Sequence, residues 1–141
     1  MTRTKPLSDY PFTCPMEVRY VDVDAMNHVN NAAYVTYLEI ARTRLWRERL
    51  GFAGSARDFP FIVARVAVDF RSPIGLEDAV TVGVAVTHVG RTSFTFAYRV
   101  EASGRLAAEA ETVQVAYDYV TGKPMAVGDD LRARLFVLLV R

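Results

Sequence analysis

The feature of this sequence that most constrains its fold is a stretch of about twenty residues, 31–50, without glycine or proline. Apolar side chains recur in this stretch at the three- and four-residue spacing of a helix. They are Tyr34, Tyr37, Leu38, Ala41 and Leu45. Asn30 or Asn31 is suited to cap the start of such a helix, and Gly51 is suited to end it. The spacing therefore predicts one α-helix about 28 Å long.

The two halves of the predicted helix differ in charge. Residues 32–41 contain a single charged side chain, Glu39, whereas residues 42–49 contain four arginines and a glutamate. A helical segment that is apolar on all sides is typically buried, and a charged segment lies at the surface. We therefore expect the first half to be enclosed by the rest of the fold and the second half to emerge into solvent.

Strand patterns dominate the remaining sequence. Four segments after the helix alternate with the period of two that is typical of strands. They are 62–71, 80–87, 94–100 and 108–119. An earlier segment, 12–20, is interrupted by Pro15 and is expected to form a short or edge strand. The breaks at 89–91 and 102–105 are too short for parallel crossovers, which predicts antiparallel pairing. Together these elements predict an α+β fold, a five-stranded antiparallel sheet wrapped around one long helix.

The C-terminal segment, 129–140, is predicted to be a short helix or an edge element. Asp129 could cap such a helix. Its last six residues, 135–140, are all apolar, and a run of this kind is unfavourable in water. We expect the segment to pack on the sheet or on a second subunit.

The composition narrows the classes of protein. A chain of 141 residues, 51% apolar and 23% charged, has the size and proportions of one globular domain spanning 1–141. Its net charge of +1 creates no field that would attract nucleic acid or anionic lipid. The longest apolar run is six residues, too short to cross a membrane. Cys14 is the single cysteine and cannot form an internal disulfide, which fits a cytoplasmic protein.

Residues 20–31, directly before the predicted helix, form the densest polar cluster in the sequence. The backbone N–H groups at a helix start lack intrahelical partners and carry part of the helix dipole, so they stabilise an oxygen that becomes negative. Asp24 or Asp22 beside them could attack a carbonyl, or could deprotonate a water that attacks it. His28 could move a proton or anchor the turn by a hydrogen bond.

Two other interpretations of this cluster remain open. Asp and Asn side chains commonly build turns and cap helices, so the cluster could be purely structural. Alternatively, Asp22, Asp24 and His28 could bind a metal, although the sequence has no second His or Cys cluster that would complete the coordination. We expect no metal and no cofactor.

Three segments resemble a known family. They are D-V-D-A-M-N-H-V-N-N-A-A-Y-V-T-Y-L-E-I-A-R, then P-I-G-L-E-D-A-V-T-V, and finally V-A-Y-D-Y-V-T-G-K-P-M. In this order they resemble the 4-hydroxybenzoyl-CoA thioesterase-like acyl-CoA thioesterases. The resemblance implies a hot-dog fold and a homodimer or homotetramer in which sheets join edge to edge. It also implies hydrolysis of a thioester to a carboxylic acid and free coenzyme A, with coenzyme A entering only as part of the substrate.

The resemblance also implies roles for particular residues. It makes Asp24 the nucleophile or general base, and it makes the backbone amide at Asn31 the donor that polarises the thioester carbonyl. His28 belongs to an H-V-N-N variant of the family motif. Such a sparse site is chemically sufficient, because a thiol has a pKa of about 8.5 and leaves easily as thiolate. Glu39 matches the helix glutamate used by another branch, and its alternative role is an ion pair with Arg42 or Arg65.

The resemblance says less about which residues contact the substrate. The phosphates of coenzyme A need cationic partners, for which Arg91 with Thr92 and Ser93 is a candidate, as are Arg57 and Lys123. The acyl group is expected to lie between the helix start and the sheet or a subunit boundary. Tyr34, Phe61 and the loop 51–60 could line its pocket.

Two other functions are compatible with the same fold. A hot-dog hydratase or dehydratase would need a histidine and a carboxylate set across the site, with His28 and His88 as the available histidines. A non-catalytic acyl-CoA binding module would bind coenzyme A without releasing thiol. The sequence favours the thioesterase.

Overall fold

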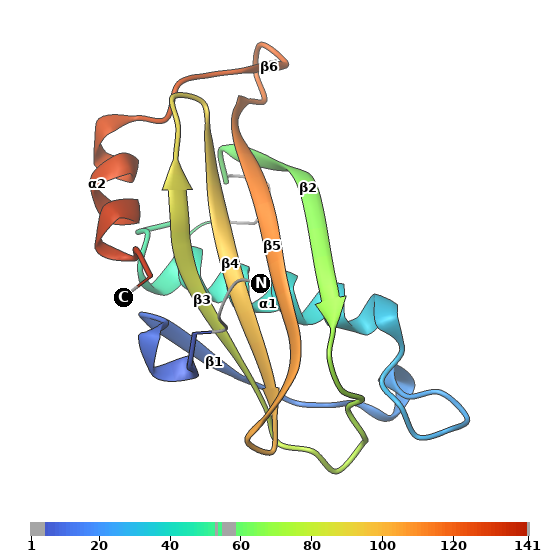
Figure 1. Cartoon of the computed structure of the whole chain (residues 1–141). Helices are drawn as coiled ribbons and strands as arrows, with labels where there is room; N and C mark the ends of the chain where they lie inside the picture. Colours follow the sequence, from blue (N-terminus) through green and yellow to red (C-terminus); the bar gives the residue numbers. More distant parts are fainter. Residues whose placement is uncertain (1–4, 53, 55–58, 141) are drawn as a thin grey trace.

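The computed structural model describes residues 5–52, 54 and 59–140. Two α-helices, two short 3-10 helices and six strands make up this part of the chain (Figure 1). The helices are η1 (Leu7–Asp9), η2 (Tyr20–Asp22), α1 (Asn31–Glu48) and α2 (Asp129–Val137). The strands are β1 (Phe12–Met16), β2 (Phe61–Phe70), β3 (Val80–Val89), β4 (Ser93–Ala102), β5 (Arg105–Asp118) and β6 (Lys123–Pro124). No helix in these ranges is long and apolar enough to span a membrane.

The sheet has the predicted five antiparallel strands, of which β1 is the short edge strand expected. Their order is β1-β3-β4-β5-β2, and the two-residue β6 pairs with the end of β5. The tight connections give the hairpins β3–β4 and β4–β5. β1 lies at one edge, where Pro15 is tolerated because an edge strand needs fewer backbone donors. β2 forms the other edge and pairs only with β5.

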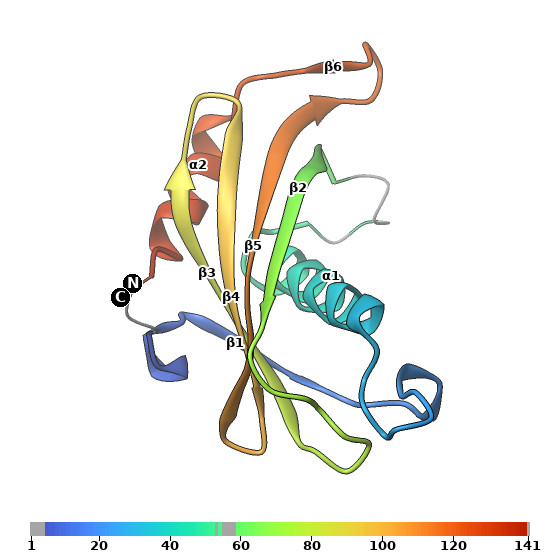
Figure 2. The same cartoon turned by 45° about the vertical axis from the view of Figure 1, so that its right-hand side comes forward.

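The sheet curls around α1, as Figure 2 shows, and the predicted architecture is confirmed. Asn30 caps the helix by accepting a hydrogen bond from the Ala33 backbone N–H at 3.0 Å. Gly51, with φ of 80°, follows the helix end in the left-handed region that glycine adopts easily. The concave face of the sheet and the buried face of the helix form the core. Trp46 lies at its centre, stacked on Phe61 with ring centroids 4.6 Å apart.

The expected difference between the two halves of α1 is wrong. Burial follows the face of the helix and not its position along the chain, because the whole helix lies against the sheet. Its buried residues extend from Ala33 to Trp46 and include Arg42. The opposite face is exposed along its length and includes the apolar side chains of Val35 and Ile40.

The C-terminal segment is a helix that packs on β3. Leu135 and Leu138 are buried, and the Val86 backbone N–H donates to the Leu138 carbonyl at 2.7 Å. The expected packing on the sheet is therefore confirmed. The expected cap is wrong, because Gly128 occupies the N-cap position and Asp129 is the first helical residue.

Candidate active site

The polar turn before α1 is organised around the side chain of Asp24. Its Oδ1 accepts hydrogen bonds from the backbone N–H groups of Met26 at 2.9 Å and His28 at 3.1 Å. The Asp24 backbone N–H donates to the His28 carbonyl at 2.8 Å. Asn27 completes the turn with φ of 60°, a conformation that asparagine adopts more readily than most residues. The turn therefore fixes the orientation of the Asp24 carboxylate.

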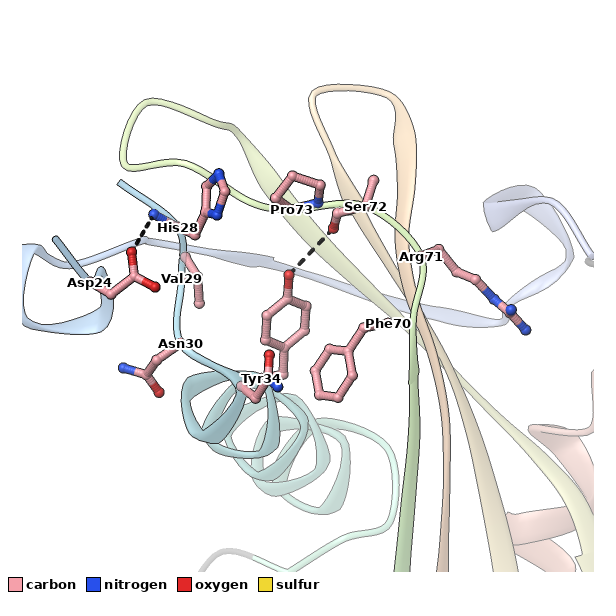
Figure 3. Close-up of a pocket in the computed structure, with 10 residues that line it drawn as sticks. Asp24, His28, Val29, Asn30, Tyr34, Phe70, Arg71, Ser72 and Pro73 are labelled. Atoms are coloured by element: carbon pink, nitrogen blue, oxygen red, sulfur yellow. Dashed lines mark hydrogen bonds between the residues drawn. The ribbon is translucent and has the colours of Figure 1, made fainter. Parts of the chain in front are cut away.

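The Asp24 carboxylate lies at the rim of a pocket of about 510 Å³ (Figure 3). The side chain is solvent-exposed, and Oδ2 accepts no hydrogen bond from the described residues, which leaves this oxygen available to a ligand. The backbone hydrogen bonds from His28 and Met26 lower the pKa of Asp24 below its ordinary value of 3.8. Asp24 is therefore an anion at neutral pH, at the edge of a cavity.

The start of α1 forms the floor of the same pocket. Asn30 and Asn31 line it, and the side chain of Asn30 satisfies the Ala33 N–H. In the described part of the chain, the backbone N–H groups of Asn31 and Ala32 have no hydrogen-bond partner. These are the unpaired donors expected at a helix start, and the helix dipole adds positive potential there. Asp24 and Asn31, whose backbone N–H is open, thus line one cavity.

Asp22, two residues earlier, has a different environment. It is only 5% exposed and accepts hydrogen bonds from the Arg19 backbone N–H at 2.9 Å and the Tyr37 hydroxyl at 2.8 Å. Burial raises the pKa of Asp22, but these hydrogen bonds and the Arg19 guanidinium outweigh it and lower the pKa overall. Its backbone carbonyl accepts from the Asn30 N–H at 2.9 Å and Nδ2 at 3.0 Å. Asp22 therefore anchors the turn to the helix.

The two aspartates are directed to different partners and do not form a shared ligand set. Among the described residues, no three His, Cys, Asp or Glu side chains are grouped so that they could hold a metal ion.

The opposite wall of the pocket comes from the end of β2 and the residues after it. Phe70, Arg71, Ser72 and Pro73 line this side. Tyr34 reaches it from α1, with its ring edge-on to Phe70 at 4.9 Å and its hydroxyl 3.4 Å from the Ser72 carbonyl (Figure 3). Burial raises the pKa of Tyr34, so the hydroxyl stays protonated and donates.

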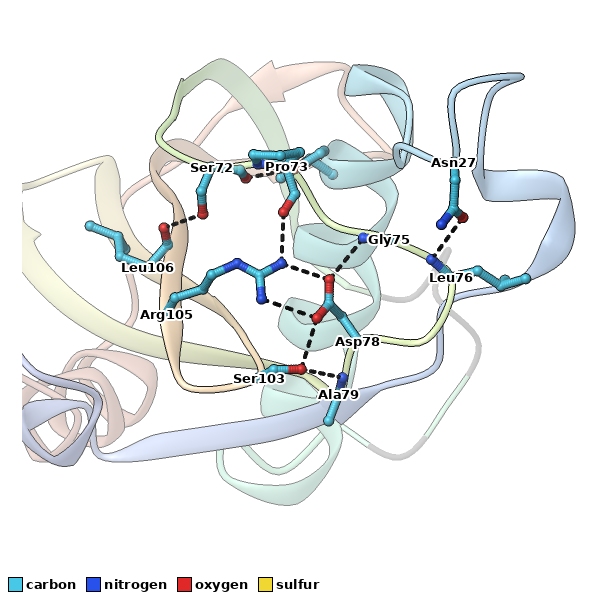
Figure 4. A network of polar contacts seen from close by, with 11 residues as sticks. Asn27, Ser72, Pro73, Gly75, Leu76, Asp78, Ala79, Ser103, Arg105 and Leu106 are labelled. Carbon is cyan, nitrogen blue, oxygen red and sulfur yellow. Dashed lines mark hydrogen bonds and ion pairs between the residues drawn. The ribbon is translucent and has the colours of Figure 1, made fainter.

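An ion pair behind this wall holds the loop between β2 and β3 in place (Figure 4). Arg105 donates to both carboxylate oxygens of Asp78, at 2.7 and 3.1 Å, and to the Pro73 carbonyl at 2.9 Å. Asp78 also accepts from the Gly75 N–H and the Ser103 hydroxyl, both at 2.8 Å. The hydrogen bonds from Arg105 are the main reason that the pKa of Asp78 is well below its ordinary range.

The same loop contacts the Asp24 turn. The Val29 N–H donates to the Ile74 carbonyl at 2.7 Å, and the Leu76 N–H donates to Asn27 Oδ1 at 3.3 Å. Sequence reasoning missed Asp78 and Arg105 as supports of the site. The only signal was that Asp78 belongs to the second of the three family-like segments.

The structure brings four of the predicted site residues together. Asp24, His28, Asn31 and Tyr34 all line the pocket. Phe61 is not part of this pocket and stacks on Trp46 near the other end of α1.

The predicted phosphate contacts lie elsewhere in the single chain. Arg91 and Thr92 form the β3–β4 turn and Ser93 begins β4, at the end of the sheet opposite the Asp24 turn in both overall views. Lys123 is exposed on β6, and Arg57 lies outside the described residues.

The expected ion pair of Glu39 is wrong. Arg65 pairs with Glu111 at 3.6 Å, and Arg42 donates to the Tyr98 hydroxyl at 3.3 Å. Glu39 is exposed and lies outside the pocket that contains Asp24. His88 lies on β3 and also does not line this pocket.

A curled antiparallel sheet around one helix, with a pocket at the start of that helix, defines a hot-dog fold of the thioesterase type. The chain belongs to the Thioesterase-like superfamily, whose family profile matches residues 18–135.

Individual relatives agree with this assignment. The acyl-CoA thioester hydrolase YbgC of Escherichia coli O6:H1 is 34% identical over 119 residues, which cover 82% of this chain and 89% of the relative. The long-chain acyl-CoA thioesterase FadM of Escherichia coli K12 is 28% identical over 123 residues, covering 85% and 93%. A thioesterase from Thermus thermophilus, solved with coenzyme A and Zn, has a TM-score of 0.84 and 34% identity, covering 92% and 95%.

Proposed function

We propose that this chain hydrolyses acyl-coenzyme A thioesters to a carboxylic acid and free coenzyme A. The observation that carries the proposal is that Asp24 and Asn31, the first residue of α1, line the same pocket, and that in the described part of the chain the Asn31 backbone N–H has no hydrogen-bond partner. Membership of the Thioesterase-like superfamily supports the reaction. The relatives named for acyl-CoA hydrolysis, and the Thermus structure with coenzyme A, support the substrate class.

The proposed chemistry uses charges already present at the site. The thioester carbonyl oxygen lies against the open amides near Asn31, which stabilise the oxyanion of the tetrahedral intermediate without moving. Asp24 attacks the carbonyl carbon or deprotonates the water that does so, because its Oδ2 has no competing partner in the described part of the chain. The C–S bond then breaks, and coenzyme A leaves as a thiolate that needs little help from an acid. Where water attacked, the carboxylic acid forms directly; where Asp24 attacked, water then hydrolyses the acyl–Asp24 anhydride to the carboxylic acid and frees the Asp24 carboxylate. His28 lines the same pocket and is proposed to assist.

Release of free thiol from a panel of aryl, short-chain and long-chain acyl-CoAs tests the proposal. The Asp24→Asn variant should lower kcat on the best substrate by about a hundredfold or more, the usual contribution of a positioned base. Asp129→Asn, an exposed aspartate at the start of α2, is the matched control and should leave kcat unchanged. An Asp24→Asn variant that retains kcat within about threefold of the wild type would refute the catalytic role. Hydration of crotonyl-CoA without thiol release would indicate a hydratase, and coenzyme A binding without turnover would indicate a binding module.

We also propose that the chain acts as a homodimer, or a homotetramer of such dimers, joined through β2. β2 is a ten-residue edge strand with exposed apolar side chains that include Ile62, Val66 and Phe70. Val35 extends this apolar surface onto α1, where it lines a pocket together with Val63 and Val66. A twofold axis would let the free edges of two β2 strands pair with each other.

The mass of the protein in solution, measured by light scattering after gel filtration, tests the dimer. Ile62→Lys should shift the wild-type dimer toward monomer, whereas Phe136→Lys, which replaces an exposed apolar residue on α2, should not. A monomeric wild type at micromolar concentration would contradict the proposal. A cytoplasmic location is proposed as well, because Cys14 is a free thiol.

A further inference from the structure

Arg42 is a buried cation that has no counter-ion among the residues that the structure describes. It is 9% exposed, and its hydrogen bond goes from Nη1 to the Tyr98 hydroxyl at 3.3 Å, which is itself 2.7 Å from Thr112 Oγ1. In the described part of the chain, no carboxylate forms an ion pair with it. A guanidinium has five N–H donors and stays charged, and burial of such a charge is costly unless an anion compensates it. The environment of Arg42 therefore calls for an anion from outside the single chain.

A pocket of about 280 Å³ leads to this arginine. Its walls are mostly aliphatic, and the buried hydroxyl-bearing side chain of Thr112 also lines it. The lining residues are Val35, Leu38, Glu39, Arg42, Val63, Val66 and Thr112. Val35 and Val66 also belong to the proposed dimer surface, so in the dimer a second copy would form the outer wall of this pocket. Apolar walls with one buried guanidinium suit a hydrocarbon chain that ends in a carboxylate, because the chain contacts the walls and the carboxylate can accept two parallel N–H bonds.

This pocket and the candidate active site are both lined by residues of α1 and β2. Tyr34, Leu38 and Arg42 are spaced by four residues and share one face of α1. The strand β2 runs beside this face in the opposite direction, since Phe70 contacts Tyr34 and Phe61 contacts Trp46. From the open amide of Asn31 to Arg42 is eleven residues, about 16 Å along the helix.

We propose that Arg42 binds a carboxylate at the far end of the acyl chain, so that the preferred substrates are ω-carboxyl acyl-CoA thioesters of medium length. An extended polypeptide backbone advances about 1.2 Å per bond, and we take the same advance for an extended acyl chain. The arginine side chain covers part of the distance. An acyl chain of about eight to twelve carbons therefore spans the interval. This inference rests on the proposed thioesterase function and names its substrate class.

Glu39 provides an internal check on the inference. It lines the Arg42 pocket one turn earlier, is exposed, and makes no ion pair with Arg42. An anionic chain end would be repelled by Glu39 as it enters. Glu39→Gln should therefore strengthen the preference for anionic substrates, whereas a loss of stability in this variant would identify Glu39 as the counter-ion and overturn the inference.

The test compares decanoyl-CoA with the mono-CoA thioester of decanedioic acid, which has the same chain length and a terminal carboxylate. The wild type should show a kcat/KM at least about tenfold higher for the carboxylate substrate, because a site built around a polar group discriminates against the analogue that lacks it. Arg42→Met should abolish this preference, so that the two substrates are hydrolysed with similar kcat/KM. Arg42→Lys should keep part of it, and Arg47→Met, an exposed arginine on the same helix, should keep all of it.

Binding of free decanedioate, measured by calorimetry, does not depend on turnover. It therefore distinguishes failure of the inference from failure of the proposed function. Arg42-dependent binding without hydrolysis of either thioester would refute the thioesterase and retain the anion site. Hydrolysis of decanoyl-CoA with no carboxylate preference, or a preference that survives Arg42→Met, would overturn the inference alone. A weaker dimer in Arg42→Met with unchanged substrate preference would show that a second copy supplies the anion, which also overturns it. If Arg42→Met does not fold, Arg42→Gln, which removes the charge and keeps a polar side chain, gives the same comparison.

Discussion

Asp22 and Asp24 are two residues apart in one polar turn, but they occupy opposite environments. The Asp22 carboxylate is buried and engaged by Arg19 and Tyr37. The Asp24 carboxylate is exposed, is bonded through one oxygen to backbone N–H groups, and points its other oxygen toward a pocket. Both have lowered pKa values, so charge alone does not distinguish them. The difference lies in the hydrogen-bond partners. The Asp22 carboxylate accepts bonds that hold the turn in place, whereas Oδ2 of Asp24 accepts none from the described residues.

Replacement of Asp22 gives the largest expected loss of stability. Asp22→Ala removes a buried acceptor and leaves the Tyr37 hydroxyl and the Arg19 N–H without a partner. The free energy of unfolding should fall by about 3 kcal/mol, measured by urea denaturation. Asp24→Asn should leave the urea midpoint unchanged, because only backbone groups in an exposed turn lose a charged acceptor. Equal destabilisation by the two variants would remove the distinction between them.

Two tyrosines one turn apart on α1 extend the comparison. The Tyr37 hydroxyl donates to the buried Asp22 carboxylate at 2.8 Å, whereas the Tyr34 hydroxyl lies 3.4 Å from the Ser72 carbonyl. A hydrogen bond to a charged group contributes more than a long one to a neutral carbonyl. Tyr37→Phe should lower the free energy of unfolding by about 1.5 kcal/mol and Tyr34→Phe by less than about 0.5 kcal/mol. A larger loss in Tyr34→Phe would contradict the assignment of the structural role to the Asp22 side of the turn.

The ion pair behind the pocket offers a sharper test of how the Asp24 side is positioned. Asp78→Asn should lower kcat by about tenfold, because the loop that contacts Asn27 and Val29 loses its anchor and small displacements of a site are costly. Arg99–Glu101 is a matched pair on β4, also at 2.7 Å, that does not line the pocket. Glu101→Gln should leave kcat within about twofold. If both variants lower kcat equally at matched stability, the network has no specific link to the turn.

Most of the fold could be predicted from the sequence because its signals are local. Helical spacing, the period of two and the short breaks at 89–91 and 102–105 each act over a few residues, and the structure has the helix and strands that they predict. The enclosed half of α1 was predicted wrongly because hydrophobic content along a helix does not reveal which face meets the sheet. Asp129 was misassigned as a cap because Gly128 ends the preceding loop one residue earlier.

The site was predictable only where it is contiguous in sequence. Asp24, His28, Asn31 and Tyr34 lie within eleven residues and share a pocket. Asp78 precedes β3 and Arg105 begins β5, and the pairing of both strands with β4 brings the two residues together. The expected Glu39–Arg42 pair followed helical spacing, but Arg42 turns toward Tyr98 in the core instead. The spacing of residues in the sequence identifies which side chains could be in contact, and the packing of the folded chain determines which of them are.

The smallest expected effect is the response of the two aspartates to mild acid. Because the pKa of Asp24 is below its ordinary value of 3.8, the carboxylate stays ionised well into acid. The kcat/KM should therefore change by less than about twofold from pH 7 to pH 5 and fall only below about pH 4. A fall in kcat/KM of more than about twofold between pH 7 and pH 5 would contradict this expectation.

The stability contributed by Asp22 should disappear at the same end of the pH scale. Its folded pKa is lowered from 3.8, so folding favours the ionised form and the contribution is complete above the unfolded pKa. It is lost as the pH falls through the lowered folded pKa. The difference in unfolding free energy between the wild type and Asp22→Asn should thus be constant above about pH 5 and shrink below about pH 4. A difference that instead grows in acid would mean that burial dominates, and that Asp22 and Asp24 differ in charge as well as in partners.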